Sequence, residues 1–187
     1  MFYTNGYIVK EPTVNREFAA CHTEYRGLES YRNWPLSDRE DAESKRLTTL
    51  LEQHFDQNSY VEIIADANLL QDYVNHCEKS GIEVVVMKIM TEKNTVVADK
   101  DFQDMEVLGY DCIAGDSVSY LAEIYTEGAD EIALYKTTKK LVNSNGLFND
   151  RKEADDFIAK RNKLIERGLN LEDYREGFPA KLSLVRV

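Results

Sequence analysis

The feature that most constrains the fold is a strand, helix and strand pattern over residues 60–90. Residues 60–65 form a short β-branched apolar run, and residues 82–90 are the most β-prone segment of the chain. The helix expected between them has its apolar side chains on one side, namely Leu69, Leu70, Tyr73, Val74 and Cys77. Asp66 is placed to cap this helix and Gly81 to end it. A helix between two strands predicts a right-handed parallel crossover with both strands central in a sheet.

Further strands and helices are predicted on both sides of this unit. Strands are expected over residues 1–10, 105–113 and 181–187, with a bulge or small hairpin at Asn5-Gly6 and a break or bulge at Gly109. Helices are expected over residues 38–55, 116–128, 130–142 and 150–167. The chain has 187 residues and no repeat or linker, so we predict one α/β domain spanning residues 1–187. Its mixed β-sheet is expected to hold the parallel β-α-β unit at about residues 60–90, with flanking helices.

The charge balance limits the kinds of partner that the chain can bind. It has 34 acidic and 23 basic side chains, which gives a formal net charge of -11. Such a charge repels nucleic acid and anionic membranes and suits a basic partner. No apolar stretch approaches the roughly 18 residues of a membrane span, and the start of the chain does not resemble a signal peptide. We therefore expect a cytoplasmic protein that binds neither nucleic acid nor membrane.

Motifs for catalysis, cofactors and metals do not occur in the sequence. There is no glycine-rich phosphate loop, no dinucleotide fingerprint and no nucleophile elbow. The three cysteines are far apart, which fits reduced thiols better than a disulfide framework or a zinc site. An EF-hand loop begun at Asp99 would need glycine and glutamate where the chain has Asp104 and Tyr110. The sequence thus predicts no cofactor, no metal and no catalytic residue.

Residues 99–131 concentrate negative charge, with ten acidic side chains and only Lys100 as a base. The members expected to contact a partner are Asp99, Asp101, Asp104, Glu106, Asp111 and Asp116. Carboxylates on strand ends and loops can steer a cationic surface and fix its register. The alternative interpretation is a solvated acidic face without a partner.

A second candidate surface contains Tyr31, Arg32 and Trp34. Tyrosine, tryptophan and arginine are the residues enriched at interface hot spots. The alternative interpretation is that these side chains cover a sheet edge.

The C-terminal half carries a family resemblance. The residues that carry it are Leu108-Gly109-Tyr110-Asp111, the predicted helix after Asp116, the segment 141–148, then Asp150, Glu153, Ala154 and Phe157, and the terminal strand. This pattern resembles small bacterial immunity proteins, which are carried beside polymorphic or contact-dependent toxins and neutralise them by binding. The resemblance covers about 80 residues and rests on structural motifs. It therefore implies a binding function without assigning any binding residue.

Three functions from different classes follow. The first is a cytoplasmic immunity protein that neutralises a cognate toxin, a basic nuclease-type effector, by covering its active site with an acidic surface. The second is a phage or mobile-element inhibitor of a host defence enzyme, although the acids at 99–131 are too irregular for a mimic of nucleic acid. The third is a small enzyme that uses the strand-end carboxylates Asp66, Asp111 and Asp116. Helix capping explains Asp66 and Asp116 without catalysis. The sequence leaves the oligomeric state open.

Overall fold

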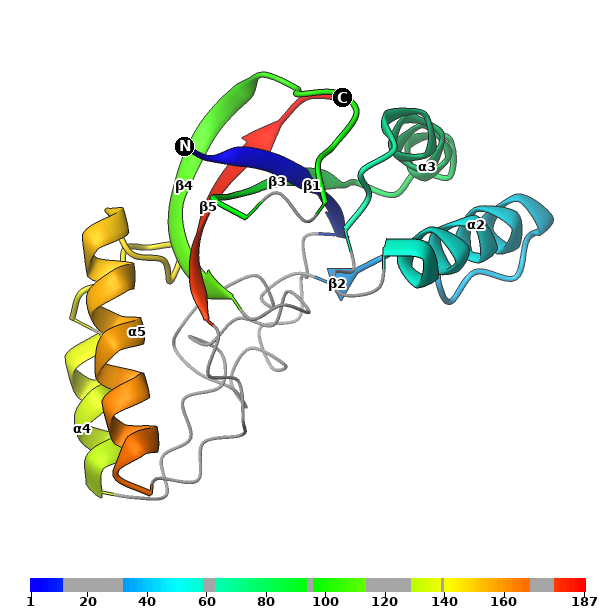
Figure 1. Cartoon of the computed structure of the whole chain (residues 1–187). Helices are drawn as coiled ribbons and strands as arrows, with labels where there is room; N and C mark the ends of the chain where they lie inside the picture. Colours follow the sequence, from blue (N-terminus) through cyan, green and yellow to red (C-terminus); the bar gives the residue numbers. More distant parts are fainter. Residues whose placement is uncertain (12–31, 59–62, 94–95, 114–128, 139, 169–176) are drawn as a thin grey trace. The chain divides into compact units, whose positions relative to one another are not determined.

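The computed structural model describes residues 1–11, 32–58, 63–93, 96–113, 129–138, 140–168 and 177–187. Their strands and helices, in chain order, are β1 (Tyr3–Glu11), β2 (Arg32–Asn33), α2 (Ala42–Asn58), α3 (Ala67–Lys79), β3 (Val85–Thr91), β4 (Asp104–Ile113), α4 (Ala129–Thr138), α5 (Arg151–Glu166) and β5 (Phe178–Val185) (Figure 1). This content confirms the predicted α/β class.

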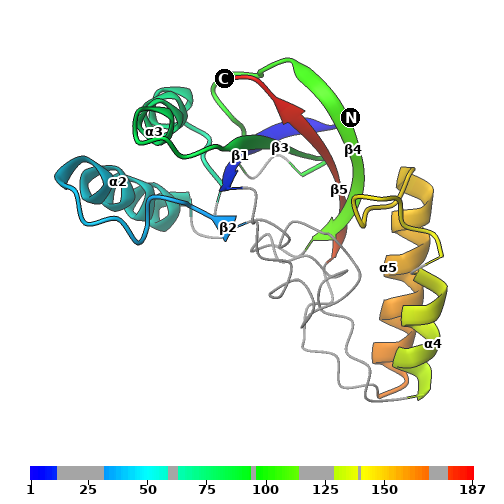
Figure 2. The same ribbon diagram turned by 180° about the vertical axis from the view of Figure 1, so that it is seen from behind.

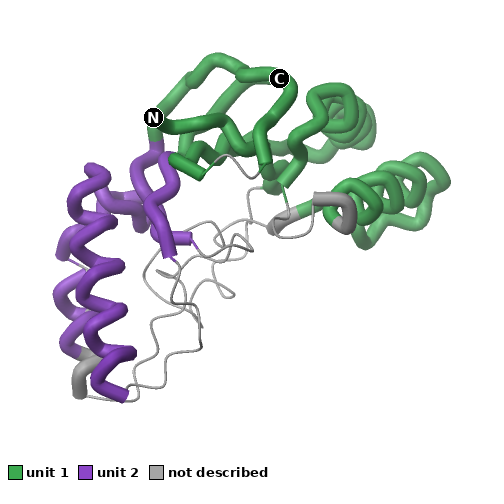
Figure 3. Tube along the Cα trace, in the orientation of Figure 1, with its two compact units in different colours: residues 1–14, 30–107, 182–187 green, residues 15–29, 108–181 purple. Residues whose placement is uncertain are grey.

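The chain divides into two compact units, each made of separate stretches of sequence (Figure 3). Unit 1 contains residues 1–14, 30–107 and 182–187, and unit 2 contains residues 15–29 and 108–181. Strands β4 and β5 each pass from one unit into the other. The expectation that the whole chain behaves as one domain stays a prediction.

The sheet has the strand order β2-β1-β3-β5-β4, and β1 pairs antiparallel with both β2 and β3. Tyr7 lies opposite Lys88 of β3 and also forms an antiparallel bridge with Ile64. The bridge consists of two backbone hydrogen bonds, in which Tyr7 N donates to Ile64 O over 2.9 Å and Ile64 N donates to Tyr7 O over 2.8 Å. β1 therefore separates the two arms of the unit predicted at about residues 60–90, and the prediction of a parallel β-α-β unit there is wrong, because each arm pairs antiparallel with β1.

This error has a physical reason. The apolar periodicity of residues 60–90 identifies a helix and a strand, but it contains no information about which strand lies beside which. β1 has six consecutive buried residues, from Asn5 to Lys10. A strand buried on both faces requires a central position in its sheet. β1 takes that position, with Ile64 on one side and β3 on the other.

The Asn5-Gly6 signal produces a bulge in β1 rather than a hairpin. The register between β1 and β3 shifts between Thr4 and Gly6. The Asn5 amide nitrogen donates to Lys93 O over 2.8 Å and to Val96 O over 2.7 Å, and its oxygen accepts from Thr91 N over 2.8 Å. The unpaired residue of the bulge thus binds the loop after β3.

Helix α3 follows its sequence signals closely. The Asp66 carboxylate caps it by accepting from Asn68 N over 2.8 Å and Leu69 N over 3.0 Å. Gly81 follows its end with a φ of 70°, a conformation that favours glycine. The predicted apolar face is buried at Leu70, Tyr73, Val74 and Cys77. Local periodicity and capping chemistry were sufficient to predict this helix.

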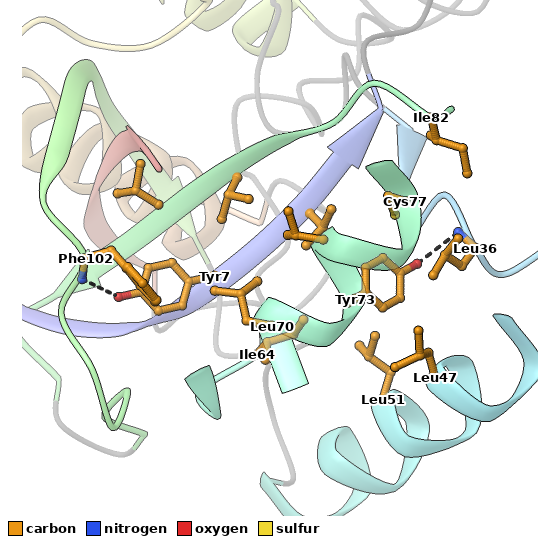
Figure 4. Packing of buried hydrophobic residues seen from close by; sticks show 14 residues of the cluster. Tyr7, Leu36, Leu47, Leu51, Ile64, Leu70, Tyr73, Cys77, Ile82 and Phe102 are labelled. Carbon is orange, nitrogen blue, oxygen red and sulfur yellow. Dashed lines mark hydrogen bonds between the residues drawn. The ribbon is translucent and has the colours of Figure 1, made fainter. Parts of the chain in front are cut away.

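The core of unit 1 lies between the sheet and helices α2 and α3, which lie side by side (Figure 2). Two buried tyrosines connect it to surrounding loops (Figure 4). The Tyr73 hydroxyl accepts from Leu36 N over 2.9 Å. The Tyr7 hydroxyl donates to Lys100 O over 2.6 Å and accepts from Phe102 N over 3.1 Å. Tyr7 thereby fixes the loop that leads from β3 to β4.

Unit 2 has a separate core in which α4 and α5 pack with β4. Its buried members are Cys112, Leu134, Phe148, Ala154, Phe157 and Ile158. Asp150 caps α5 by accepting from Glu153 N over 3.0 Å, as its position predicted. Arg161 belongs to the buried face of α5 and is 4% exposed. The helix predicted over 116–128 lies outside the described residues.

Candidate functional site

The acidic residues expected on one surface have different surroundings. Asp111 is fully buried in unit 2, and its Oδ1 accepts from Cys112 N over 2.7 Å. A buried carboxylate cannot contact a partner on the surface, so its assignment to an exposed acidic face is corrected. Asp116 and Tyr31 lie outside the described residues. Arg32 is placed only as a backbone position in β2.

Asp101 and Asp104 bind the buried ammonium group of Lys88. Lys88 extends from β3 and is 3% exposed as a residue. Its Nζ lies 2.9 Å from Asp101 Oδ1, 2.5 Å from Asp104 Oδ1 and 2.7 Å from Phe102 O. The Thr4 hydroxyl also donates to Asp101 Oδ1, over 2.7 Å. Two of the predicted partner contacts therefore neutralise an internal cation.

The pKa values agree with this ion pairing. The hydrogen bond from Thr4, followed by the one from Lys88, lowers the pKa of Asp101 below its ordinary value. Burial acts to lower the pKa of Lys88, but the hydrogen bonds to Asp104 and Asp101 outweigh it and the pKa is raised. Both groups are thus charged at neutral pH. Lys88 is a structural cation and not a deprotonated nucleophile.

Asp99 connects the loop before β4 to the start of α3. Its Oδ1 accepts from Ala67 N over 2.9 Å, and its own N–H donates to Ala65 O over 3.0 Å. Ala67 is the first residue of α3, where a negative charge is favoured by the helix dipole. Asp99 is also exposed, so it contributes to the surface charge as well as to this junction.

Glu106 is exposed within β4, between two exposed apolar residues. Met105 is 64% exposed and Val107 is 51% exposed. Alternation along the strand places Met105 and Val107 on one face and Asp104 and Glu106 on the other. β4 is the last strand in the sheet order, and among the described residues no strand pairs with residues 104–107 on their outer side. We call residues 104–107 the β4 edge.

Trp34 fits the alternative interpretation of an aromatic that covers a sheet edge. Its ring centroid lies 5.1 Å from that of Phe55 and 6.2 Å from that of Tyr73. Its backbone N–H donates to Val9 O over 3.2 Å, and its φ is 56°, which is unusual for a bulky side chain. Trp34 is half-buried against the core of unit 1, and this packing explains it without a partner.

One constellation resembles a catalytic triad in composition but not in geometry. Ser44 Oγ lies 3.0 Å from His76 Nε2 and 2.7 Å from Asp41 Oδ2. Asp41 Oδ1 lies 3.3 Å from the same His76 Nε2. In a triad the carboxylate holds the other ring nitrogen, and the serine is accessible. Here Ser44 is fully buried, and Asp41 Oδ1 accepts from Ser44 N over 2.9 Å as the cap of α2.

The Asp41 cap predicts a stability change in acid. Hydrogen bonds from the backbone and side chain of Ser44, with a smaller contribution from His76, lower the Asp41 pKa from 3.8 to about 2. A lowered folded-state pKa contributes stability above the ordinary value, and this contribution is lost as the pH falls through the folded value. Between about pH 4 and pH 2, wild type should therefore lose more stability than Asp41→Asn, whose amide oxygen still caps the helix. Thermal unfolding midpoints across that range measure this, and parallel profiles would contradict it.

The two described cysteines are unreactive at neutral pH. Burial raises the pKa of Cys77 to about 12 and holds the pKa of Cys112 well above its ordinary value. Neither forms a disulfide, and both are buried. Because the thiolate is the reactive form, neither side chain acts as a nucleophile at neutral pH.

No protein-family model, curated protein or solved structure matches the chain. In the part of the chain that the structure describes, no three side chains of His, Cys, Asp or Glu could hold a metal ion. The helices within the described ranges include none that is long and apolar enough to cross a membrane.

Sequence reasoning identified Glu106 but not its neighbours Met105 and Val107. Both were expected to be sheet residues, because apolar residues in a strand are usually core residues. Their alternation with Asp104 and Glu106 predicts a strand whose apolar face is buried, so the local pattern contains no signal for the exposure of Met105 and Val107.

Proposed function

We propose that this chain is a binding protein that neutralises a basic partner protein by covering its active site, with the β4 edge as its contact surface. The observation that carries the proposal is the exposure of Met105 and Val107, at 64% and 51%, beside the exposed carboxylate of Glu106. Exposed apolar side chains flanked by charge are typical of protein interaction sites. The net charge of -11 favours association with a basic surface.

A toxin of the nuclease type is the partner that best fits this chemistry. The C-terminal half resembles immunity proteins, whose partners are toxins. A nuclease needs a basic surface to bind its substrate, and an acidic protein can cover that surface. Location in the cytoplasm, where such a toxin acts, belongs to the same proposal.

The two alternative functions have weaker support. Among the carboxylates of the enzyme hypothesis, Asp66 caps α3 and Asp111 is fully buried. A mimic of nucleic acid would need carboxylates in a regular double row, whereas Asp101 and Asp104 converge on one lysine. Neither arrangement favours a catalytic or mimicking role over capping and ion pairing.

The function is tested by affinity capture of the tagged full chain from its own organism at low and then high salt. The expected result is one stoichiometric basic protein that salt releases, that is toxic when expressed alone, and that co-expression of this chain makes harmless. Absence of a partner at both salt concentrations, or toxicity that co-expression does not relieve, would contradict the proposal.

Charge reversal at Glu106 is expected to weaken binding of that partner. Glu106→Lys places a cation against a basic surface, so the Kd should rise by about tenfold or more, with a weaker dependence on salt. Glu166→Lys is the matched control, because Glu166 is an exposed residue in the last turn of α5 and the change in net charge is identical. Isothermal titration of both variants measures the difference. Equal weakening in the two variants would show that only net charge matters.

A further inference from the structure

The geometry points to β-strand addition as the mode of recognition. In this mode the outer side of the β4 edge pairs with an extended segment of the partner in which basic and apolar side chains alternate. This inference rests on the proposed function, since it names the part of the basic partner that the same surface binds. It is carried by the backbone direction of β4, by the side chains of residues 104–107 and by their charge.

The backbone of β4 presents hydrogen-bonding groups on its outer side. Leu108 O accepts from the Asn143 side chain over 2.9 Å, and Tyr110 exchanges two backbone hydrogen bonds with Phe148, over 2.8 and 2.9 Å. These contacts come from a segment that is not a strand of the sheet, so they mark the side of β4 opposite β5. Strand alternation of period two then directs the N–H and C=O of Glu106 to that same side. Among the described residues, no strand covers them there.

The β4 edge carries only part of the protection that is usual for an exposed strand, because its acids Asp104 and Glu106 repel acidic strands but not basic ones. Natural edge strands are commonly blocked by lysine, proline or a bulge, which prevents pairing with other chains. Residues 104–107 contain no lysine and no proline, and they expose Met105 and Val107 instead. An accessible backbone with exposed apolar side chains is what β-strand addition requires, because main-chain bonds supply affinity and side chains supply specificity.

Charge selects the occupant of this edge. An antiparallel pair of two copies centred on Glu106 would place the two Glu106 carboxylates opposite each other, and like charges in that position are destabilising. Each copy also carries a net charge of -11. Asp101 and Asp104 together carry one negative charge more than Lys88 neutralises, which adds to the negative charge of the same unit. The segment that complements both faces of the β4 edge has lysine or arginine opposite Glu106. On the other face it has apolar residues beside Met105 and Val107.

The experiment uses the full chain and three fluorescent heptapeptides. The first has the sequence Lys-Val-Lys-Val-Lys-Val-Lys, the second has the same sequence with N-methyl groups on the internal lysine amides, which are the ones that face β4 when lysine lies opposite Glu106, and the third has glutamate in place of lysine. Fluorescence anisotropy should show saturable binding of the first peptide and about tenfold or more weaker binding of the other two. Equal binding of the methylated peptide, or no saturable binding of the first, would overturn the inference.

A substitution in the chain isolates the backbone contribution. Glu106→Pro removes the outward N–H and leaves the inward N–H groups of Met105 and Val107 for pairing with β5. Glu106→Gln is its control, because it removes the charge and keeps the N–H. Proline should weaken binding of the first peptide by about tenfold and glutamine by about threefold. Equal effects would overturn pairing through the backbone. Should the proline variant lose its circular dichroism spectrum, the methylated peptide decides the question on wild type.

Failure of the inference and failure of the proposed function are distinguishable. A captured toxic partner that binds Glu106→Pro as tightly as wild type would refute edge pairing and leave neutralisation intact. Selective binding of the first peptide without any toxic partner would refute neutralisation and leave the edge site intact. A dimer of the chain in sedimentation equilibrium that Glu106→Pro abolishes would refute a basic occupant in favour of a second copy.

Discussion

Replacement of Lys88 by methionine is expected to lower the free energy of unfolding by about 2–3 kcal/mol, less than the cost of breaking a fully buried pair, because the side chains of Asp101 and Asp104 are 71% and 27% exposed. Lys88 is 3% exposed, and its ammonium group is the shared partner of Asp101, Asp104 and Phe102 O. Methionine fills a similar volume but leaves the Asp104 carboxylate and the carbonyl without this cation. Removal of one member of a buried ion pair costs much more than loss of a surface pair. Urea denaturation at neutral pH measures the change.

The control for this substitution is Lys160→Met, at an exposed position of α5, which should change the free energy of unfolding by less than about 0.5 kcal/mol. The double variant Lys88→Met with Asp104→Asn should recover part of the loss, because it removes one of the stranded charges. The difference in free energy of unfolding between wild type and Lys88→Met should also shrink as the pH falls below 3.8, the ordinary pKa of Asp. The lowered pKa of Asp101 contributes stability above 3.8, and this contribution is lost as the pH falls through the folded-state value. A loss below about 1 kcal/mol would mean that the cluster is effectively solvated.

Replacement of Gly109 by alanine is the second substitution with a large expected effect. Gly109 lies in β4 with a φ of 139°, which side chains rarely adopt. A Cβ atom there would lie 2.6 Å from Phe148 O and 2.9 Å from Leu147 Cβ. Backbone strain and overpacking together should lower the free energy of unfolding by about 3–5 kcal/mol. The same urea denaturation measures this loss.

Gly81→Ala is the matched control for the conformational part of this effect. Gly81 has a φ of 70°, and a Cβ there would meet nothing within 4 Å. Its substitution should therefore cost only about 1 kcal/mol, from conformation alone. A comparable loss at both glycines would show that the close approach of residues 147–148 to β4 contributes nothing.

Local patterns predicted the parts of the fold that depend on neighbours in sequence. The faces of α3 and α5 and the caps Asp66 and Asp150 follow from spacings of three and four residues. The order of strands depends on contacts distant in sequence. Tyr7 pairs with Lys88 and bridges to Ile64, and no periodicity within residues 60–90 contains that information.

The sequence predicted which residues of the candidate site are acidic, but not which of them are buried or paired. Counting charges identified the acidic segment and Glu106. It could not show that Asp101 binds a lysine 13 residues earlier in sequence, or that Asp111 is buried. Lys88 lies in the most β-prone run of the chain, where a single lysine is usually solvated at the edge of a strand. Exposure of Met105 and Val107 depends on what packs over their face of β4, a property of the tertiary structure rather than of local sequence.

The most direct test of binding at the β4 edge is amide hydrogen exchange of the full chain with and without its captured basic partner. Pairing of the β4 edge should slow exchange at Glu106, whose N–H becomes hydrogen-bonded, and should leave exchange in α5 unchanged. Protection confined to other segments, with residues 104–107 exchanging as in the free protein, would contradict it.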